Sequence, residues 1–149
     1  MSDCIFCQII RKQSPANIVY EDGQVVAFLS NRPVNEGHTL VIPKKHYENI
    51  YEIPEDEAAY LFKISKRVAY AVKDAMGAEG IRIVQNNGWA AGQVIFHLHV
   101  HVIPLASTEG FVHGKAFREH AYPRSREECE MDAQKIGQNL SKDDSIVKF

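Results

Sequence analysis

Apolar residues recur along the chain with two different periods, which predict short strands and longer helices. Strand-like alternation, bounded by turn residues, occurs in the stretches 17–20, 24–29, 38–43, 81–85 and 94–104. Helix-like spacing of three and four residues occurs in the stretches 4–11, 55–76 and 125–140. The first two strands are separated by Asp22-Gly23, a pair that favours a tight hairpin turn. The pattern therefore predicts a chain of short strands interrupted by one long helix.

The long helix has the clearest boundaries. Pro54 suits a first helical turn, and the acidic residues at 55–57 follow where the N-terminus of a helix attracts negative charge. Gly77 stands just past the last apolar position and is expected to cap the helix, while Ser125 and Glu128 form a capping box for the last helix. Because the strands are joined mostly by short turns, we predict an α+β domain, a mostly antiparallel five-stranded sheet covered by helices on one face.

Composition narrows the class of protein. The 149 residues fit one domain, spanning 1–149, and 45% of them are hydrophobic and 24% charged, as in ordinary globular chains. No apolar run is long enough to cross a bilayer, and a net charge of −2 gives no broad cationic surface for nucleic acid. Residues 1–12 lack the pattern of a signal peptide. We expect a cytoplasmic protein with no membrane or nucleic-acid partner.

Three histidines alternate with apolar residues in the stretch 94–104. In an extended strand, successive side chains point to opposite faces, so His97, His99 and His101 face one side and the apolar residues between them face the other. Imidazoles packed side by side repel one another when protonated and add little as packing, which favours a chemical role. An imidazole can attack phosphorus directly, and by geometry alone any of the three could do so.

The loop 86–93 runs directly into these histidines. Gly88 and Gly92 allow its backbone amides to approach an anion closely, and the Gln93 amide can donate to an oxygen. The loop and the imidazoles together predict a site for a phosphate group.

At this point the sequence resembles the histidine triad (HIT) family, whose signature is His-x-His-x-His with apolar spacers. The second stretch that resembles the family is 37–46, and the likeness covers residues 4–104, leaving 105–149 as a C-terminal extension in which His113 and His120 are expected on the surface. The resemblance implies a compact HIT-like fold, a homodimer, and hydrolysis or transfer at the α-phosphate of a purine nucleotide. Nucleoside phosphoramidates and dinucleoside polyphosphates are the implied substrates.

The resemblance also implies roles for individual residues. His99 matches the nucleophile, His101 the histidine that supports it and contacts phosphate, and His38 a further histidine behind them. Asn86, Gly92 and Gln93 match positions of the loop that contact phosphate.

Two positions of the nucleotide site depart from the family pattern. Val94 stands where the family usually has serine or threonine, so a hydroxyl contact to phosphate is missing and only the backbone amide can donate. Ser30, followed by Asn31, stands where an acidic residue or asparagine usually binds the ribose hydroxyls. Both departures bear on substrate preference.

The cysteines suggest a metal. An odd count without an export signal indicates thiols or metal ligands, and Cys4-x-x-Cys7 needs two more ligands to complete a tetrahedron. The resemblance to a zinc-binding prokaryotic branch of the family implies that His46 and His97 supply them, which makes zinc a structural cofactor. A reduced thiol pair that only packs the short N-terminal helix is the alternative. Cys129 falls on an apolar helical stripe and is expected in the core.

Two further functions stay open at the level of sequence. The alternating histidines can hold a catalytic metal, since two imidazoles on one strand reach one ion. The departures at Val94 and Ser30 also fit a nucleotide-binding or partner-binding module whose catalysis is weak or lost.

Overall fold

The computed structural model describes residues 4–106 and 123–141, and its architecture is α+β, as predicted. In chain order the elements are α1 (Ile5–Ile10), β1 (Ile18–Glu21), β2 (Val25–Leu29), β3 (Thr39–Pro43), α2 (Glu55–Met76), β4 (Gly80–Val84), the 3-10 turn η1 (Trp89–Ala91), β5 (Val100–Leu105) and α3 (Arg126–Ser141). His113 and His120 lie outside the described residues. Across the described ranges, no helix combines the length and the apolar character that a membrane span requires.

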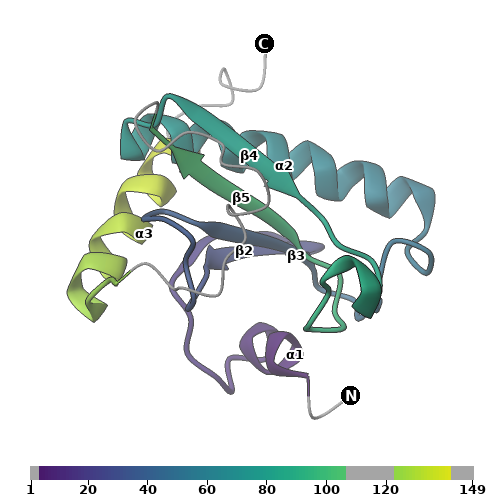
Figure 1. Ribbon diagram of the computed structural model, residues 1–149. Coiled ribbons are helices and arrows are strands. Elements are labelled where there is room, and N and C mark those ends of the chain that lie inside the picture. The colour runs from purple at the N-terminus through teal and green to yellow at the C-terminus, as the bar shows by residue number, and fades with distance from the viewer. Residues whose placement is uncertain (1–3, 107–122, 142–149) are drawn as a thin grey trace.

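The five strands form one antiparallel sheet in the order β1-β2-β3-β5-β4. The predicted hairpin between β1 and β2 is present, and Asp22 Oδ1 closes it by accepting the N–H groups of Gln24 and Val25 at 2.7 and 2.8 Å. Helix α2 separates β3 from β4 in sequence, and β5 then returns between them (Figure 1). This insertion places β5, which follows His97 and His99 and contains His101, in the interior of the sheet.

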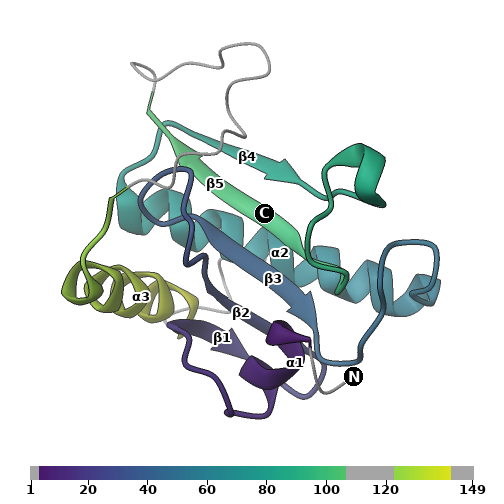
Figure 2. The same ribbon diagram turned by 60° about the horizontal axis from the view of Figure 1, so that its bottom comes forward.

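The two faces of the sheet are covered by different helices. Helices α2 and α3 pack on one face, where buried side chains such as Ile64 and Val68 belong to one cluster with Val41 and Val100. Helix α1 packs on the opposite face, as both views show (Figures 1 and 2). The expectation of helices on one face alone is therefore wrong for α1, because every residue of β2 and β3 is buried and both of their faces need cover.

The predicted helix ends are confirmed. Gly77 adopts φ +63°, and its N–H bonds the carbonyls of the last turn of α2. At α3, Glu128 N–H donates to Ser125 Oγ at 3.1 Å and Ser125 N–H donates to Glu128 Oε1 at 2.9 Å, the reciprocal bonds of a capping box. Cys129 lies half-buried against the main core, as its apolar stripe predicts.

The histidine strand is shorter than predicted, because β5 begins at Val100 and not at residue 94. Val41 pairs with Val100, which places Pro43 opposite Leu98, and a proline has no N–H with which to continue the ladder. Leu98 N–H donates instead to Tyr47 O at 2.7 Å. Phe96 also leaves the expected apolar face and is 36% exposed. His97 and His99 therefore lie in a connecting segment, and only His101 lies in the strand.

Candidate active site and metal centre

Three imidazoles gather on the face of the sheet that α1 partly covers. His101 pairs with Leu40, whose side chain belongs to the cluster under α1, so His101 projects to that same side. His38 lies one residue before β3. The ring centroids of His38 and His101 are 5.2 Å apart, and those of His99 and His101 are 4.9 Å apart. The fold therefore brings together the three histidines that the sequence nominated for catalysis.

The hydrogen bonds of His99 determine where its proton sits. The carbonyl of His97 lies 2.7 Å from His99 Nδ1, and a carbonyl can only accept, so Nδ1 carries the hydrogen. The neutral ring then has its lone pair on Nε2. Burial lowers the pKa of His99, against the opposing effect of the bond to His97, so the ring is neutral near pH 7. The result is an imidazole with an unprotonated Nε2, the form that a nucleophile requires.

His38 and His101 form a second ordered pair. Val34 N–H donates to His38 Nδ1 at 2.9 Å, so the hydrogen of His38 is on Nε2, which donates to His101 Nδ1 at 3.0 Å. His101 then carries its own hydrogen on Nε2. Burial, with smaller contributions from neighbouring histidines, lowers the pKa of His38 to about 3 and that of His101 to about 4. Both rings are neutral at pH 7 and hold defined tautomers.

The loop 86–93 is shaped by the buried side chain of Gln93. Its Oε1 accepts Gly88 N–H at 2.8 Å, and its Nε2 donates to Glu48 O at 2.6 Å and to Ile95 O at 3.1 Å. Both amide hydrogens of Gln93 are thus engaged in holding the loop. Gly92 adopts φ +91°, a conformation that favours glycine, and a Cβ built there would lie 4.0 Å from Asn86 Nδ2.

The remaining predicted nucleotide positions lie beside this loop or beside His38. Val94 is 71% exposed just after the loop. Ser30 N–H donates to His38 O at 2.9 Å, and its hydroxyl accepts Arg32 N–H at 3.2 Å. Asn31 is exposed. Ser30 is therefore connected to the cluster of His38, His99 and His101 through the backbone of His38.

Two residues near the site were not predicted from the sequence. Asn35 is buried between the loop before β3 and the end of β5, where its Nδ2 donates to Pro104 O at 3.1 Å. Phe6 projects from α1 onto the histidines, with its ring edge-on to those of His97 and His99 at centroid distances of 5.8 and 5.3 Å. Neither contact has a local signal in the sequence, apart from the closeness of Asn35 to His38.

The four predicted metal ligands also meet. One ligand atom from each of Cys4, Cys7, His46 and His97 lies within 4.8 Å of the other three. His97 Nδ1 is 3.4 Å from Cys4 Sγ and 3.6 Å from Cys7 Sγ, and His46 Nδ1 is 3.4 Å from Cys7 Sγ. An S···N edge of a tetrahedron around zinc measures about 3.6 Å from ordinary Zn–S and Zn–N distances. The donor set and its dimensions therefore fit a tetrahedral ion.

A hydrogen bond to Pro43 orients the His97 ring so that it can act as a metal ligand. Its Nε2 lies 2.8 Å from Pro43 O, so Nε2 carries the hydrogen and Nδ1 presents its lone pair to the thiols. Burial lowers the pKa of His97 to about 4, despite the bond to Pro43, and keeps the ring neutral. His97 also joins the two sites, because its side chain faces the thiols while its carbonyl holds the Nδ1 hydrogen of His99.

The metal-ligand cluster bears on the open question of a catalytic metal. Within residues 4–106 and 123–141, the cluster of three or more metal-binding side chains contains His97 but neither His99 nor His101. The alternating histidines are thus divided between two centres, one with metal-binding geometry and one with ordered neutral imidazoles.

Known proteins with the same features identify the family. Residues 11–108 match the HIT domain, about two-thirds of the chain, and this protein belongs to the HIT family. The relative named adenylylsulfatase HINT3, from Arabidopsis thaliana, is 35% identical over 130 residues, which cover 87% of this chain and 66% of that protein. These likenesses support, at a general level, a hydrolase or transferase of nucleotides.

Two solved structures share the fold along nearly the whole chain. A hypothetical histidine triad nucleotide-binding protein from Sulfolobus tokodaii is 43% identical with a TM-score of 0.81, covering 92% of this chain and 91% of its own. A histidine triad family protein from Mycobacterium smegmatis, solved with bound zinc, is 32% identical with a TM-score of 0.80, and 97% of each chain is covered.

Proposed function

We propose that this protein hydrolyses or transfers the nucleotidyl group of nucleotide conjugates, with His99 as the nucleophile. The observation that carries the proposal is the bond from His99 Nδ1–H to the His97 carbonyl, because it leaves the Nε2 lone pair available at neutral pH. The neutral pair of His38 and His101 beside it supports the same conclusion.

The proposed reaction has two steps. In the first, the Nε2 lone pair of His99 forms a bond to the α-phosphorus while the bond from phosphorus to the leaving group breaks, and the leaving group departs with that electron pair. In the second, a water oxygen attacks phosphorus, the P–N bond breaks, its electrons return to Nε2, and the water releases a proton. The His97 carbonyl stabilises the positive charge that His99 carries in between. The Nε2–H of His101 is proposed to donate to a phosphate oxygen.

The proposed substrates are purine nucleotides with a leaving group on the α-phosphate. Nucleoside phosphoramidates and dinucleoside polyphosphates follow from the family resemblance, and adenylyl sulfate is added because one relative is named an adenylylsulfatase. Phosphate is proposed to lie against Asn86, Gly92, Gln93 and the Val94 amide, with the ribose near Ser30 and Asn31. Because Gln93 Nε2 is already engaged, its contribution is proposed to be the shape of the loop.

We also propose that Cys4, Cys7, His46 and His97 hold a structural zinc ion. The tetrahedral spacing and the zinc-bound relative support this assignment. A zinc ion there would supply folding free energy and fix α1 against the sheet. The zinc ion would position His97, and with it the His97 carbonyl that accepts the Nδ1 hydrogen of His99. The chemical steps themselves are proposed to be carried out by the protein's side chains.

A homodimer is the proposed assembly. The edge strand β4 and the neighbouring loop expose apolar side chains, among them Ile83 at 46% and Trp89 at 73%. Within the described part of the chain β4 pairs only with β5, and apolar exposure on such an edge supports a partner there. Sedimentation at micromolar concentration tests this, and a monomer would contradict it.

The decisive experiment is a turnover screen combined with trapping of the intermediate. Wild-type protein and His99→Ala are assayed with adenosine phosphoramidate, adenylyl sulfate and diadenosine polyphosphates, and Arg126→Gln on an exposed face of α3 is the matched control. We expect turnover and acid-labile labelling by an α-labelled nucleotide in wild type and in the control, and loss of both in His99→Ala. Nucleotide binding without labelling in wild type would favour the binding-module function. Full turnover in His99→Ala would refute the proposal.

A further inference from the structure

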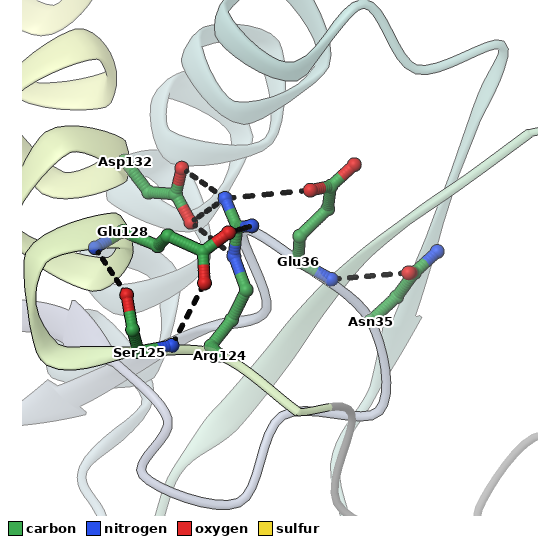
Figure 3. A network of polar contacts seen from close by, with 6 residues as sticks. All are labelled: Asn35, Glu36, Arg124, Ser125, Glu128 and Asp132. Carbon is green, nitrogen blue, oxygen red and sulfur yellow. Dashed lines mark hydrogen bonds and ion pairs between the residues drawn. The ribbon is translucent and has the colours of Figure 1, made fainter.

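The polar network that precedes α3 connects the C-terminal helix to the loop before β3 (Figure 3). The guanidinium of Arg124 binds both oxygens of Asp132, at 2.7 to 3.1 Å, and its Nη1 binds Glu128 at 2.6 Å. The Asp132 side chain is only 4% exposed. A bidentate pair with a buried carboxylate holds Arg124 in one orientation.

From this anchored position Arg124 reaches across to the other segment. Its Nη2 lies 3.3 Å from Glu36 Oε2, and Glu36 belongs to the loop between β2 and β3. Arg124 donates hydrogen bonds to the Asp132 carboxylate, which lies on α3 itself, and the Ser125–Glu128 capping box holds the first turn of the same helix. These bonds stay within α3 and the residues directly before it. The contact with Glu36 is therefore the part of the network that ties α3 to the loop.

The loop carries this restraint toward His38. Glu36 N–H donates to Asn35 Oδ1 at 3.0 Å, and the buried Asn35 side chain donates to Pro104 O at the end of β5. The backbone carbonyl of Asn35 accepts His38 N–H at 3.1 Å. Residues 34–38 thus form a turn fixed at both its outer and its inner side.

The same turn presents the group that sets the tautomer of His38. Val34 N–H donates to His38 Nδ1 at 2.9 Å, which leaves the ring hydrogen on Nε2, facing His101. If the turn shifts, the hydrogen bond from Val34 N–H to His38 Nδ1 is lost, and the ring hydrogen of His38 can then occupy either nitrogen.

We propose that Asn35, together with the Arg124–Glu36 link from α3, positions the turn 34–38 so that His38 keeps its Nε2–H directed at His101. This inference rests on the proposed catalytic function for its kinetic consequence, but not for its structural one. Asn35, Glu36 and Arg124 are positioning residues, since they act through His38 and not on the substrate. The match to the HIT domain ends at residue 108, so through Arg124 a segment outside that domain would influence the position of His38.

The kinetic test compares three single variants. Asn35→Ala removes the bridge, and we expect kcat to fall about 10- to 100-fold while KM stays within about twofold, because misplaced catalytic groups slow chemistry more than binding. Glu36→Gln keeps size and removes the charge, and we expect a fall in kcat of about two- to fivefold, the scale of one partly exposed ion pair. Glu130→Gln, which alters an exposed ion pair on α3, is the matched control and is expected to leave kcat unchanged.

A double-mutant cycle tests the route from α3. Arg124→Gln alone leaves the Asp132 carboxylate buried and unpaired, so Arg124→Gln is combined with Asp132→Asn to keep the fold. In that background Glu36→Gln is expected to change kcat no further, because the link is already absent. Additive losses, or a kcat of wild type in Asn35→Ala with the fold intact, would overturn the proposal.

Nitrogen-15 NMR of the imidazoles tests the structural part of the proposal without requiring enzymatic turnover. Two-bond correlations are expected to show His38 wholly as the Nε2–H tautomer in wild type and as a mixture in Asn35→Ala, with Glu130→Gln like wild type. An unchanged His38 spectrum in Asn35→Ala would refute the positioning role even if the protein proves active. If no substrate is turned over, the proposed function fails while this NMR test still decides the inference.

Discussion

Phe6 offers the sharpest test of how α1 supports His99, the proposed nucleophile. Its side chain is 4% exposed, and its ring meets those of Phe28, His97 and His99 edge-on at centroid distances of 5.4, 5.8 and 5.3 Å. Phe6→Leu keeps most of the apolar volume and removes these edges. At about 0.5 to 1.5 kcal/mol for each of the three aromatic pairs, the free energy of unfolding should fall by about 1.5 to 4.5 kcal/mol.

The same substitution should affect catalysis separately from stability. Without the Phe6 ring, the His99 imidazole loses an edge-to-face contact that restricts its orientation. We therefore expect kcat to fall about tenfold with KM nearly unchanged. Urea denaturation and steady-state kinetics measure the two effects, with metal content determined in each sample. Ile5→Ala on the same helix is the control, since Ile5 is 39% exposed and should cost less than about 1 kcal/mol. Equal losses in the two variants, or an unchanged kcat in Phe6→Leu, would refute the proposed support of His99.

Three further predictions follow from the metal cluster, the buried histidines and the loop. Cys7→Ser should abolish stoichiometric zinc in elemental analysis and lower the free energy of unfolding by at least about 3 kcal/mol, and retention of zinc would contradict the ligand set. Burial lowers the pKa of His38 to about 3 and that of His101 to about 4. Between pH 6.5 and 4 these two imidazoles therefore stay neutral in the folded protein, whereas in the unfolded chain, where their pKa is the ordinary 6.5, they take up protons. Their contribution to stability is complete above pH 6.5 and is lost at about 1.4 kcal/mol per pH unit for each histidine between pH 6.5 and 4, so urea midpoints that stay flat across this range would contradict the burial argument. Gln93→Glu places a carboxylate oxygen against the carbonyls that Nε2 now bonds, so denaturation should show a loss of about 2 to 4 kcal/mol and kinetics a raised KM, whereas a neutral effect would exclude Gln93 as the brace of the loop.

The division of the alternating histidines explains why neighbouring residues serve different centres. His97 directs its side chain to the thiols and its carbonyl to His99, which leaves His99 Nε2 unprotonated for the proposed chemistry. A change at the proposed metal centre is therefore expected to affect the proposed nucleophile, His99, through the single residue His97. Activity and metal content should be measured together in every variant of the four ligands.

Local patterns in the sequence determined most of the secondary structure. The helical spacing, the acidic first turn and Gly77 defined α2, and the Asp22-Gly23 pair defined the first hairpin, because these signals depend on residues within one or two turns of each other. The histidine signature and the Cys4-x-x-Cys7 pair similarly named the candidate residues. Where the pattern failed, at residues 94–99, the cause was non-local: Pro43, on another strand, has no N–H with which to extend the ladder.

Only the tertiary structure decided how those candidates work. The ring tautomers of His99 and His38 depend on a carbonyl and an N–H that folding brings against them, and the sequence contains no record of which nitrogen is bonded. The placement of α1 on the face opposite α2, the burial of Gln93 and the reach of Arg124 to Glu36 are likewise contacts between segments far apart in the chain. Residue types and their spacing set what chemistry is available, whereas burial and hydrogen bonding across the fold set which atom is free to perform it.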